Sequence, residues 1–182
     1  MRILLMCEGQ NEEVLLNNLL DADAFCFTRD DLIGRRPYLI RQLNNPTIKS
    51  ELKHYGLPVK IYRVGDKQND KLSIPKDLKG IVLSKEIYKY CIKPELEMLL
   101  ILNEGLEKEY EKVKSFQSPK SFAKKNIRYN GKKYDQSSEF LKEYYGDSNV
   151  KNLIDNIKKY KSYKRQHDKS ELYLADILKS NK

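Results

Sequence analysis

The chain has 182 residues, of which 40% are hydrophobic and 34% are charged, so it can bury a hydrophobic core as one domain or one domain with an appendage. No apolar stretch reaches the roughly 18 residues that a membrane-spanning helix requires, and the first apolar run is too short for a signal peptide. We therefore expect a cytoplasmic protein without a membrane partner.

The net charge of +9 is distributed unevenly along the chain. Residues 112–182 contain 18 Lys and Arg against 8 Asp and Glu, a net charge of +10. A basic region of this kind suits a polyanion, most plausibly nucleic acid. A lysine-rich solvated surface in an organism with an A/T-biased genome would give the same composition, so both interpretations stay open.

The first half of the chain alternates predicted strands with predicted helices. Apolar runs predict four strands, which span residues 2–7, 24–28, 58–66 and 80–84. Helical spacing predicts a helix after Gly9, one that follows a polar loop with Pro37 near its start, and one over 47–55 closed by Gly56.

The second half of the chain is predicted to be mostly helical. Pro94 suits the first turn of a long helix with an apolar face. Asn130-Gly131 indicates a hairpin turn, and three helices are predicted near 137–145, 149–160 and 167–179. We expect an α/β domain over residues 1–112 and a basic helical extension over 113–182 that packs on it.

Alternating strands and helices predict a doubly wound, mainly parallel sheet of about four strands. In such sheets the carboxyl ends of the strands collect functional residues. This rule predicts one functional edge, formed by Glu8, Thr28, Arg29, Asp66 and Ser84.

Acidic residues at that edge are candidates for a metal site. Glu8 follows the first strand and Asp66 the third, so neighbouring strands would bring both within reach of one Mg²⁺ or Mn²⁺ ion. Glu12 lies four residues beyond Glu8 on the next helix, and Asp70 four residues beyond Asp66. The alternative is that the Glu-Gly and Gly-Asp pairs are ordinary turns after strands.

Further charged residues flank the predicted edge. Arg29, Arg35 and Arg36 are candidates for holding phosphate groups, although Arg29 could instead form local ion pairs. Glu95 and Glu97 at the start of the long helix are either additional acidic site residues or ordinary partners of the helix dipole.

The basic tail interleaves cations with tyrosines, a composition that suits nucleic acid because cations neutralise phosphates and tyrosines stack on bases. Its candidate binding residues are Lys158, Lys159, Lys161, Lys164, Arg165, Tyr160 and Tyr163. A second cluster comprises Lys124, Lys125, Arg128, Lys132 and Lys133. The alternative is a solvated lysine surface with tyrosines that pack between helices.

The motif "CEGQNEE", which follows a strand and precedes an apolar helix, resembles the first motif of the TOPRIM domain, and "IKPELEMLLILNEG" is similar to a later segment. The closest likeness is to small TOPRIM-like proteins of restriction and abortive-infection loci. The resemblance implies a Mg²⁺-dependent nuclease that acts on nucleic-acid phosphodiesters in phage defence or on a mobile element, with an ATPase as a possible partner protein.

Within this resemblance Glu8 matches the family's glutamate, which acts as acid/base or metal ligand, and Asp66 matches the first acid of its Asp-x-Asp. Gln68 stands where the second aspartate would be. The chain is therefore expected to be either a divergent nuclease or a catalytically inactive module that binds nucleic acid or a partner.

The remaining chemically reactive residues are few and scattered. Cys7, Cys26 and Cys91 each lie in an apolar context, which predicts buried free thiols. His54 and His167 are isolated, and we expect structural or surface roles for both.

Overall fold

The computed structural model describes residues 1–65, 71–92, 95–146, 149–163 and 172–180, without the side chains of residues 162 and 163. Its centre is a five-stranded sheet in the order β2-β1-β3-β4-β7, in which every pairing is parallel. The strands are β1 (Ile3–Cys7), β2 (Tyr38–Leu39), β3 (Val59–Gly65), β4 (Val82–Cys91) and β7 (Leu172–Tyr173).

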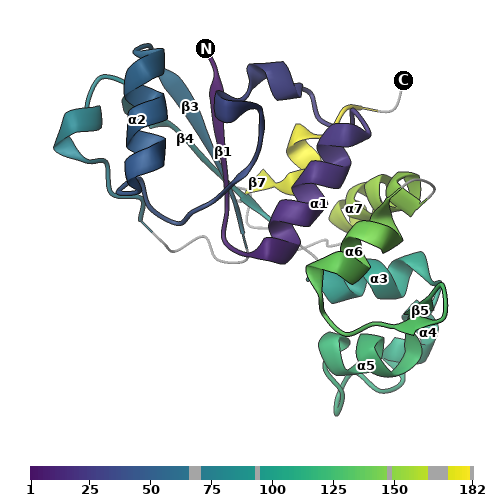
Figure 1. Ribbon diagram of the computed structural model, residues 1–182. Coiled ribbons are helices and arrows are strands. Elements are labelled where there is room, and N and C mark those ends of the chain that lie inside the picture. Colours follow the sequence, from purple (N-terminus) through teal and green to yellow (C-terminus); the bar gives the residue numbers. More distant parts are fainter. Residues whose placement is uncertain (66–70, 93–94, 147–148, 164–171, 181–182) are drawn as a thin grey trace.

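Helices cover both faces of this sheet (Figure 1). α1 (Gln10–Asp21) packs on one face, and beyond it α6 (Ser138–Tyr145) packs on α1 while α7 (Asn149–Tyr163) packs on α3 (Leu96–Asn103). α2 (Pro46–Tyr55) covers the other face. The predicted α/β class with a parallel sheet and helices on both faces is therefore confirmed, with five strands in place of about four.

The central strand β1 is buried along its whole length, as its uninterrupted apolar sequence predicts. Successive side chains alternate between the faces: Leu5 and Cys7 contact the α1 side, whereas Leu4 and Met6 contact the α2 side. β1 pairs with β3 over its full length. This pairing places Glu8, the residue that follows β1, beside the carboxyl end of β3.

α2 matches its prediction closely. Pro46 is its first residue, and the Asn45 side chain caps the helix by accepting a hydrogen bond from the backbone N–H of Ile48 at 3.2 Å. Gly56 ends the helix in the left-handed conformation with φ of 68°, where a glycine is favoured.

Two predicted strands were wrong in extent. Residues 24–28 form a loop in place of a strand, and Phe25 makes a single antiparallel bridge to Leu178. The apolar side chains of this loop still fill the core, and the rings of Phe25 and Phe27 stack with their centroids 4.9 Å apart. The strand predicted over 80–84 continues as β4 to Cys91, because its polar residues occupy partly exposed positions of the sheet.

Predicted helices also need correction. The segment around Pro37 contains the short strand β2 in place of a helix. The long helix after Pro94 is interrupted at Gly105 (φ 68°), so that α3 is followed by α4 (Glu107–Glu111). Within the described part of 167–179, the chain forms β7 and a 3₁₀ turn at Leu174–Ile177.

The region after α4 begins with α5 (Pro119–Asn126) and the antiparallel hairpin of β5 (Arg128–Tyr129) and β6 (Lys132–Lys133). The hairpin prediction is confirmed, since Asn130 and Gly131 both have positive φ, 48° and 77°. α6 and α7 then pack on α1 and α3, and β7 pairs with β4. The division at residue 112 stays a prediction.

Two further predictions concern single cysteines and the membrane. Cys7 and Cys91 are buried free thiols as expected, but Cys26 is exposed because its loop turns that side chain outward. Among the residues that the structure describes, no helix has the length and hydrophobicity needed to span a bilayer.

Candidate functional site at the carboxyl edge of the sheet

The end of β1 places Glu8 beside the end of β3. Because the register pairs Cys7 with Val64, Glu8 stands next to Gly65. A Cβ atom on Gly65 would lie 2.7 Å from both Cδ and Oε1 of Glu8, so the carboxylate lies directly over this glycine. The strand neighbourhood that the metal hypothesis requires is therefore present, while Asp66 and Asp70 themselves lie outside the described residues.

Glu12 turns back toward the same loop. α1 begins directly after Gly9, which occupies its N-cap position. A Cβ atom on Gly9 would overlap the Glu12 carboxylate. The two glycines thus leave the space that the carboxylates of Glu8 and Glu12 fill.

Negative charge gathers around the end of β1. Burial, together with the nearby carboxylates of Glu13, Glu12 and Glu8, raises the pKa of the Cys7 thiol to about 12. The thiol therefore stays protonated, and it donates a hydrogen bond to the Tyr38 carbonyl oxygen at 3.5 Å. Cys7 is thus no nucleophile at neutral pH.

Three cations that sequence reasoning missed stand on the Glu8 side of the sheet. Arg41, just beyond β2, has Nη2 4.0 Å from Oε2 of Glu8. Arg63 lies two residues before Gly65 on the same face of β3, is only 7% exposed, and pairs in register with Lys89. It is the one charged residue that is buried among those the structure describes. Arg63 continues the inward-facing series Val59, Ile61, Arg63, so the sequence pattern could have predicted its burial. Arg41 could be placed near Glu8 only once the position of β2 was known.

A hollow of about 460 Å³ extends this edge toward the C-terminal region. Its walls are residues 9–12 at the start of α1 and residues 136–138 at the start of α6. Asn11 Nδ2 donates to the Gln136 carbonyl oxygen at 3.3 Å, and the Tyr134 hydroxyl donates to Glu97 at 3.2 Å. Glu97 lies in the first turn of α3, where a carboxylate complements the helix dipole, and it also accepts this hydrogen bond.

Glu8 and Glu12 are the candidate metal ligands that the structure describes. Carboxylate oxygens of Glu8 and Glu12 are the hard ligands that Mg²⁺ and Mn²⁺ prefer, so the donor chemistry fits. Among described residues, however, no group of three or more Asp, Glu, His or Cys stands close enough to hold a metal. Asp66 and Asp70, in the segment that follows β3, stay candidates for a further carboxylate ligand.

The predicted arginines do not converge on Glu8. Leu32 bridges to Ile3 at the start of β1, so Thr28 and Arg29 lie at the opposite, amino-terminal edge, which corrects their predicted placement. Arg29 pairs with Asp21 at 2.6 Å. Arg35 pairs with Asp30 at 2.9 Å, and the Arg36 guanidinium lies 4.9 Å from the Tyr38 ring centroid.

The remaining predicted edge residue, Ser84, was also misplaced. It is the third residue of β4, and this strand reaches the carboxyl edge only at Cys91. The error follows from ending the strand too early, at the first run of charged residues. Ile92 and then Glu95 are the described residues that follow β4 at this edge.

The two basic clusters differ in their surroundings. On α7, Lys161 forms an ion pair with Asp176, Lys158 and Tyr160 are half-buried, and Lys159 is exposed. Lys164, Arg165 and the Tyr163 side chain lie outside the described residues. In the second cluster all five cations are exposed, and they are Lys124, Lys125, Arg128, Lys132 and Lys133. This α5–hairpin cluster precedes the hollow at residues 136–138 directly in sequence.

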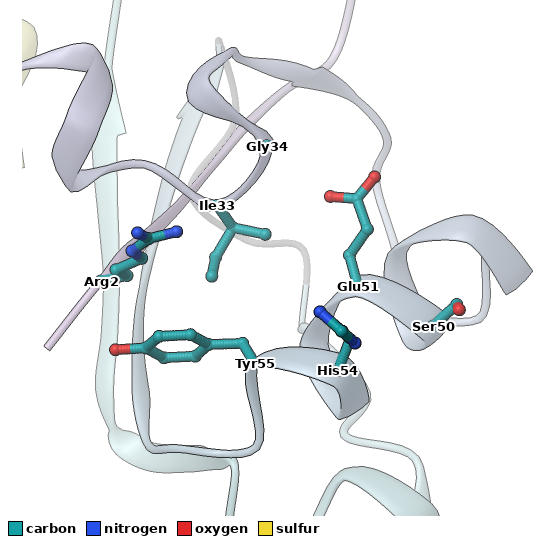
Figure 2. A pocket seen from close by; sticks show the side chains of 7 residues that line it. All are labelled: Arg2, Ile33, Gly34, Ser50, Glu51, His54 and Tyr55. Carbon is teal, nitrogen blue, oxygen red and sulfur yellow. The ribbon is translucent and has the colours of Figure 1, made fainter.

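A separate hollow of about 430 Å³ lies at the amino-terminal edge on the α2 side (Figure 2). His54 and Glu51 project from α2, and Arg2 faces Tyr55, with its guanidinium 5.5 Å from the ring centroid. Glu51 accepts a hydrogen bond from the Tyr38 hydroxyl, whose pKa is raised to about 12 mainly by burial. His54 is exposed, whereas His167 lies outside the described residues.

Comparisons of this chain with protein families, with curated proteins and with solved structures found no match. The fold and the site described above therefore carry the functional argument.

Proposed function

We propose that the chain is a divalent-metal-dependent, TOPRIM-like nuclease that acts on nucleic-acid phosphodiesters. The single observation that carries this proposal is the placement of the Glu8 carboxylate over Gly65, at the adjoining ends of two parallel strands. The carboxyl ends of neighbouring strands are where open α/β sheets bind ligands. The TOPRIM-like motif at Glu8 adds the reaction class, and phage defence or a mobile element is the setting that it implies.

In this proposal Glu8 is the acid/base or metal-ligating residue, Glu12 is a second carboxylate ligand, and Asp66 and Asp70 are further candidates. A bound Mg²⁺ or Mn²⁺ would lower the pKa of a water molecule and neutralise charge on the phosphate. Arg41 is exposed enough to contact a phosphate oxygen beside Glu8.

The α5–hairpin cluster supplies the nucleic-acid contact in this proposal. Its five exposed cations stand on the segment that leads into the hollow beside Glu12. Phosphate contacts by lysine and arginine position a nucleic acid without reading its sequence. The α7 residues remain candidates for the same role, with DNA and RNA both as possible substrates.

A catalytically inactive nucleic-acid-binding or partner-binding module is the alternative. Gln68 in place of the second aspartate favours it, as does the lack of a three-ligand cluster among the described residues. This module would keep the basic clusters and lose the chemistry. An ATPase encoded nearby would be its natural partner under the same family resemblance.

The decisive experiment compares cleavage by the wild type and by Glu8→Gln. Labelled single-stranded and double-stranded DNA and RNA are incubated with Mg²⁺, with Mn²⁺ and with EDTA. We expect cleavage that requires the metal and falls at least about 100-fold in Glu8→Gln, because the amide neither ligates Mg²⁺ well nor transfers a proton.

Glu13→Gln is the matched control, since Glu13 lies on the same helical turn but lines a different hollow, beside Arg36. This variant should keep its activity. Full cleavage by Glu8→Gln would rule the proposal out, and no cleavage by the wild type together with salt-sensitive binding would establish the inactive module.

A further inference from the structure

Phe116 is the most exposed large hydrophobic residue that the structure describes, at 77%. It lies in the turn of residues 112–116 that joins α4 to α5. Aromatic rings on either side of this turn are buried: Tyr110 and Phe122 meet edge to face with their ring centroids 5.3 Å apart. Phe116 thus presents a phenyl ring to solvent in a region that otherwise packs its aromatic rings.

The backbone that carries this ring is held in place. The N–H groups of Phe116 and Gln117 both donate to the Val113 carbonyl oxygen, at 3.0 and 2.9 Å, and the Val113 side chain packs against the core. On the other side, the Ser118 hydroxyl caps α5 by accepting a hydrogen bond from the Ser121 N–H at 3.2 Å. The ring therefore projects from an anchored turn, so little ordering of the backbone would oppose binding.

The charge around Phe116 has a single sign. Residues 112–134 contain eight Lys and Arg and no Asp or Glu. Five of these cations form the α5–hairpin cluster, and the other three, Lys112, Lys114 and Lys120, are exposed within four residues of Phe116. Lys114 pairs with Glu111 at 2.5 Å. A surface of this kind is complementary to a polyanion.

An exposed ring among cations narrows the class of polyanion. The phenyl ring has a flat apolar face and no hydrogen-bonding group, so it can stack on any base without reading its identity. Bases in a duplex are stacked on one another and present only their edges in the grooves, whereas a single strand can offer the face of an unpaired base.

We propose that Phe116 stacks on an unpaired base of a single-stranded nucleic acid, whose phosphates are bound by Lys112, Lys120 and the α5–hairpin cluster. This inference rests on the nucleic-acid contact of the proposed function, and it adds that the strand at this surface is single.

Binding in EDTA, where metal-dependent cleavage cannot occur, tests the proposal by fluorescence anisotropy. Phe116→Ala should weaken binding of a labelled oligothymidylate at least about 5-fold, the low end of what one stacked base contributes. Binding of a duplex of equal length should change less than about 2-fold, because the cations remain. Leu57→Ala is the control, since Leu57 is 59% exposed and follows α2, far from α5 (Figure 1). Equal effects of Phe116→Ala on single strand and duplex would overturn the proposal.

A fluorescent reporter distinguishes stacking from attraction by charge. The chain contains no tryptophan, so Phe116→Trp introduces a single indole at the proposed contact. Oligothymidylate should quench its fluorescence, whereas an abasic oligonucleotide should bind the cations and leave the fluorescence unchanged. A blue shift with phosphatidylserine vesicles and no quenching by oligothymidylate would identify a lipid surface as the partner and overturn the proposal.

Stacking and cleavage can fail separately in these measurements. If the wild type cleaves no nucleic acid but oligothymidylate quenches the Phe116→Trp variant, stacking is supported and the nuclease function is wrong. If the wild type cleaves but Phe116→Ala binds single strands as tightly as the wild type does, the nuclease function stands and the stacking proposal is wrong. The melting temperature of Phe116→Ala should match that of the wild type, because the side chain is exposed.

Discussion

At the scale of single residues, the site depends on two glycines that make room for two carboxylates. Gly65 has no positive φ, so its role is space and not backbone freedom. Glu8 occupies that space with 20% of its side chain exposed. A carboxylate held at a strand end in this way can present oxygens to a ligand without first reorganising.

Substituting Gly65→Ala tests this arrangement directly. The new methyl group would force Glu8 out of place, at a cost of about 1–3 kcal/mol in the free energy of unfolding, as for other overpacked sites. Urea unfolding measures the effect. Glu8→Ala provides the control background: there the methyl group meets no carboxylate and its cost should largely disappear. An equal cost in both backgrounds would show that Glu8 does not fill the space.

At the scale of elements, β1 is a buried strand whose carboxyl end lies among acidic residues. Burial and these acidic residues both act on the pKa of its last residue, Cys7. Folding raises the pKa of the Cys7 thiol from 9.0 to about 12. The folded state therefore holds this proton more tightly than the unfolded state. The stability linked to it is complete below about pH 9 and is lost as the pH rises toward about 12.

Comparison with Cys7→Ala isolates this contribution from the tyrosines that titrate in the same range. Above about pH 9 the wild type should lose up to about 1.4 kcal/mol of unfolding free energy per pH unit relative to the variant, as measured by urea unfolding along a pH series. Cys26→Ala, in which an exposed thiol is removed, should run parallel to the wild type. Parallel curves for all three proteins would contradict a buried, carboxylate-flanked thiol.

The elements also show what a sequence can and cannot predict. β1 was predictable because an uninterrupted apolar run reports burial on both faces, β3 because its apolar residues alternate with polar ones, and α2 because Gly56 marks its end. β2 and β7 were not, since each has two residues and its pairing comes from the tertiary fold. That is why Arg41, which follows β2, escaped notice while Glu8 and Glu12 did not.

At the scale of the whole molecule, acidic residues stand at the carboxyl edge of the sheet, and a basic cluster lies on the segment that precedes the neighbouring hollow in sequence. Glu8 and Glu12 stand at the strand ends, and the α5–hairpin cluster stands on the segment that leads to the same hollow. Such an arrangement suits a nucleic acid: the cations would bind its phosphates, and one phosphate would contact a metal ion held by the carboxylates.

Salt dependence of binding checks this arrangement, with or without catalysis. Replacing Lys124, Lys125, Arg128 and Lys133 by Gln, and leaving Lys132, which pairs with Glu143 at 2.8 Å, should reduce the slope of log Kobs against log salt by about 0.7–0.9 for each phosphate that the protein no longer neutralises. Fluorescence anisotropy with a labelled oligonucleotide measures the slope. Lys49→Gln with Lys53→Gln, on α2, is the control, since these lysines pair with Asp77. If the four substitutions leave the slope unchanged, the nucleic acid binds to another surface, and the basic residues of α7 are the first candidates.

The pairing of β7 with β4 has a consequence for the order in which the chain folds. β4 has ten residues, and its outer neighbour among the described residues is Leu172–Tyr173, while Lys179 donates its backbone N–H to the Ala24 carbonyl at 2.8 Å. Contacts between such distant residues form late. During synthesis on the ribosome, β4 therefore waits as an open sheet edge, and Lys85 and Lys89 along it would oppose pairing with a second nascent chain.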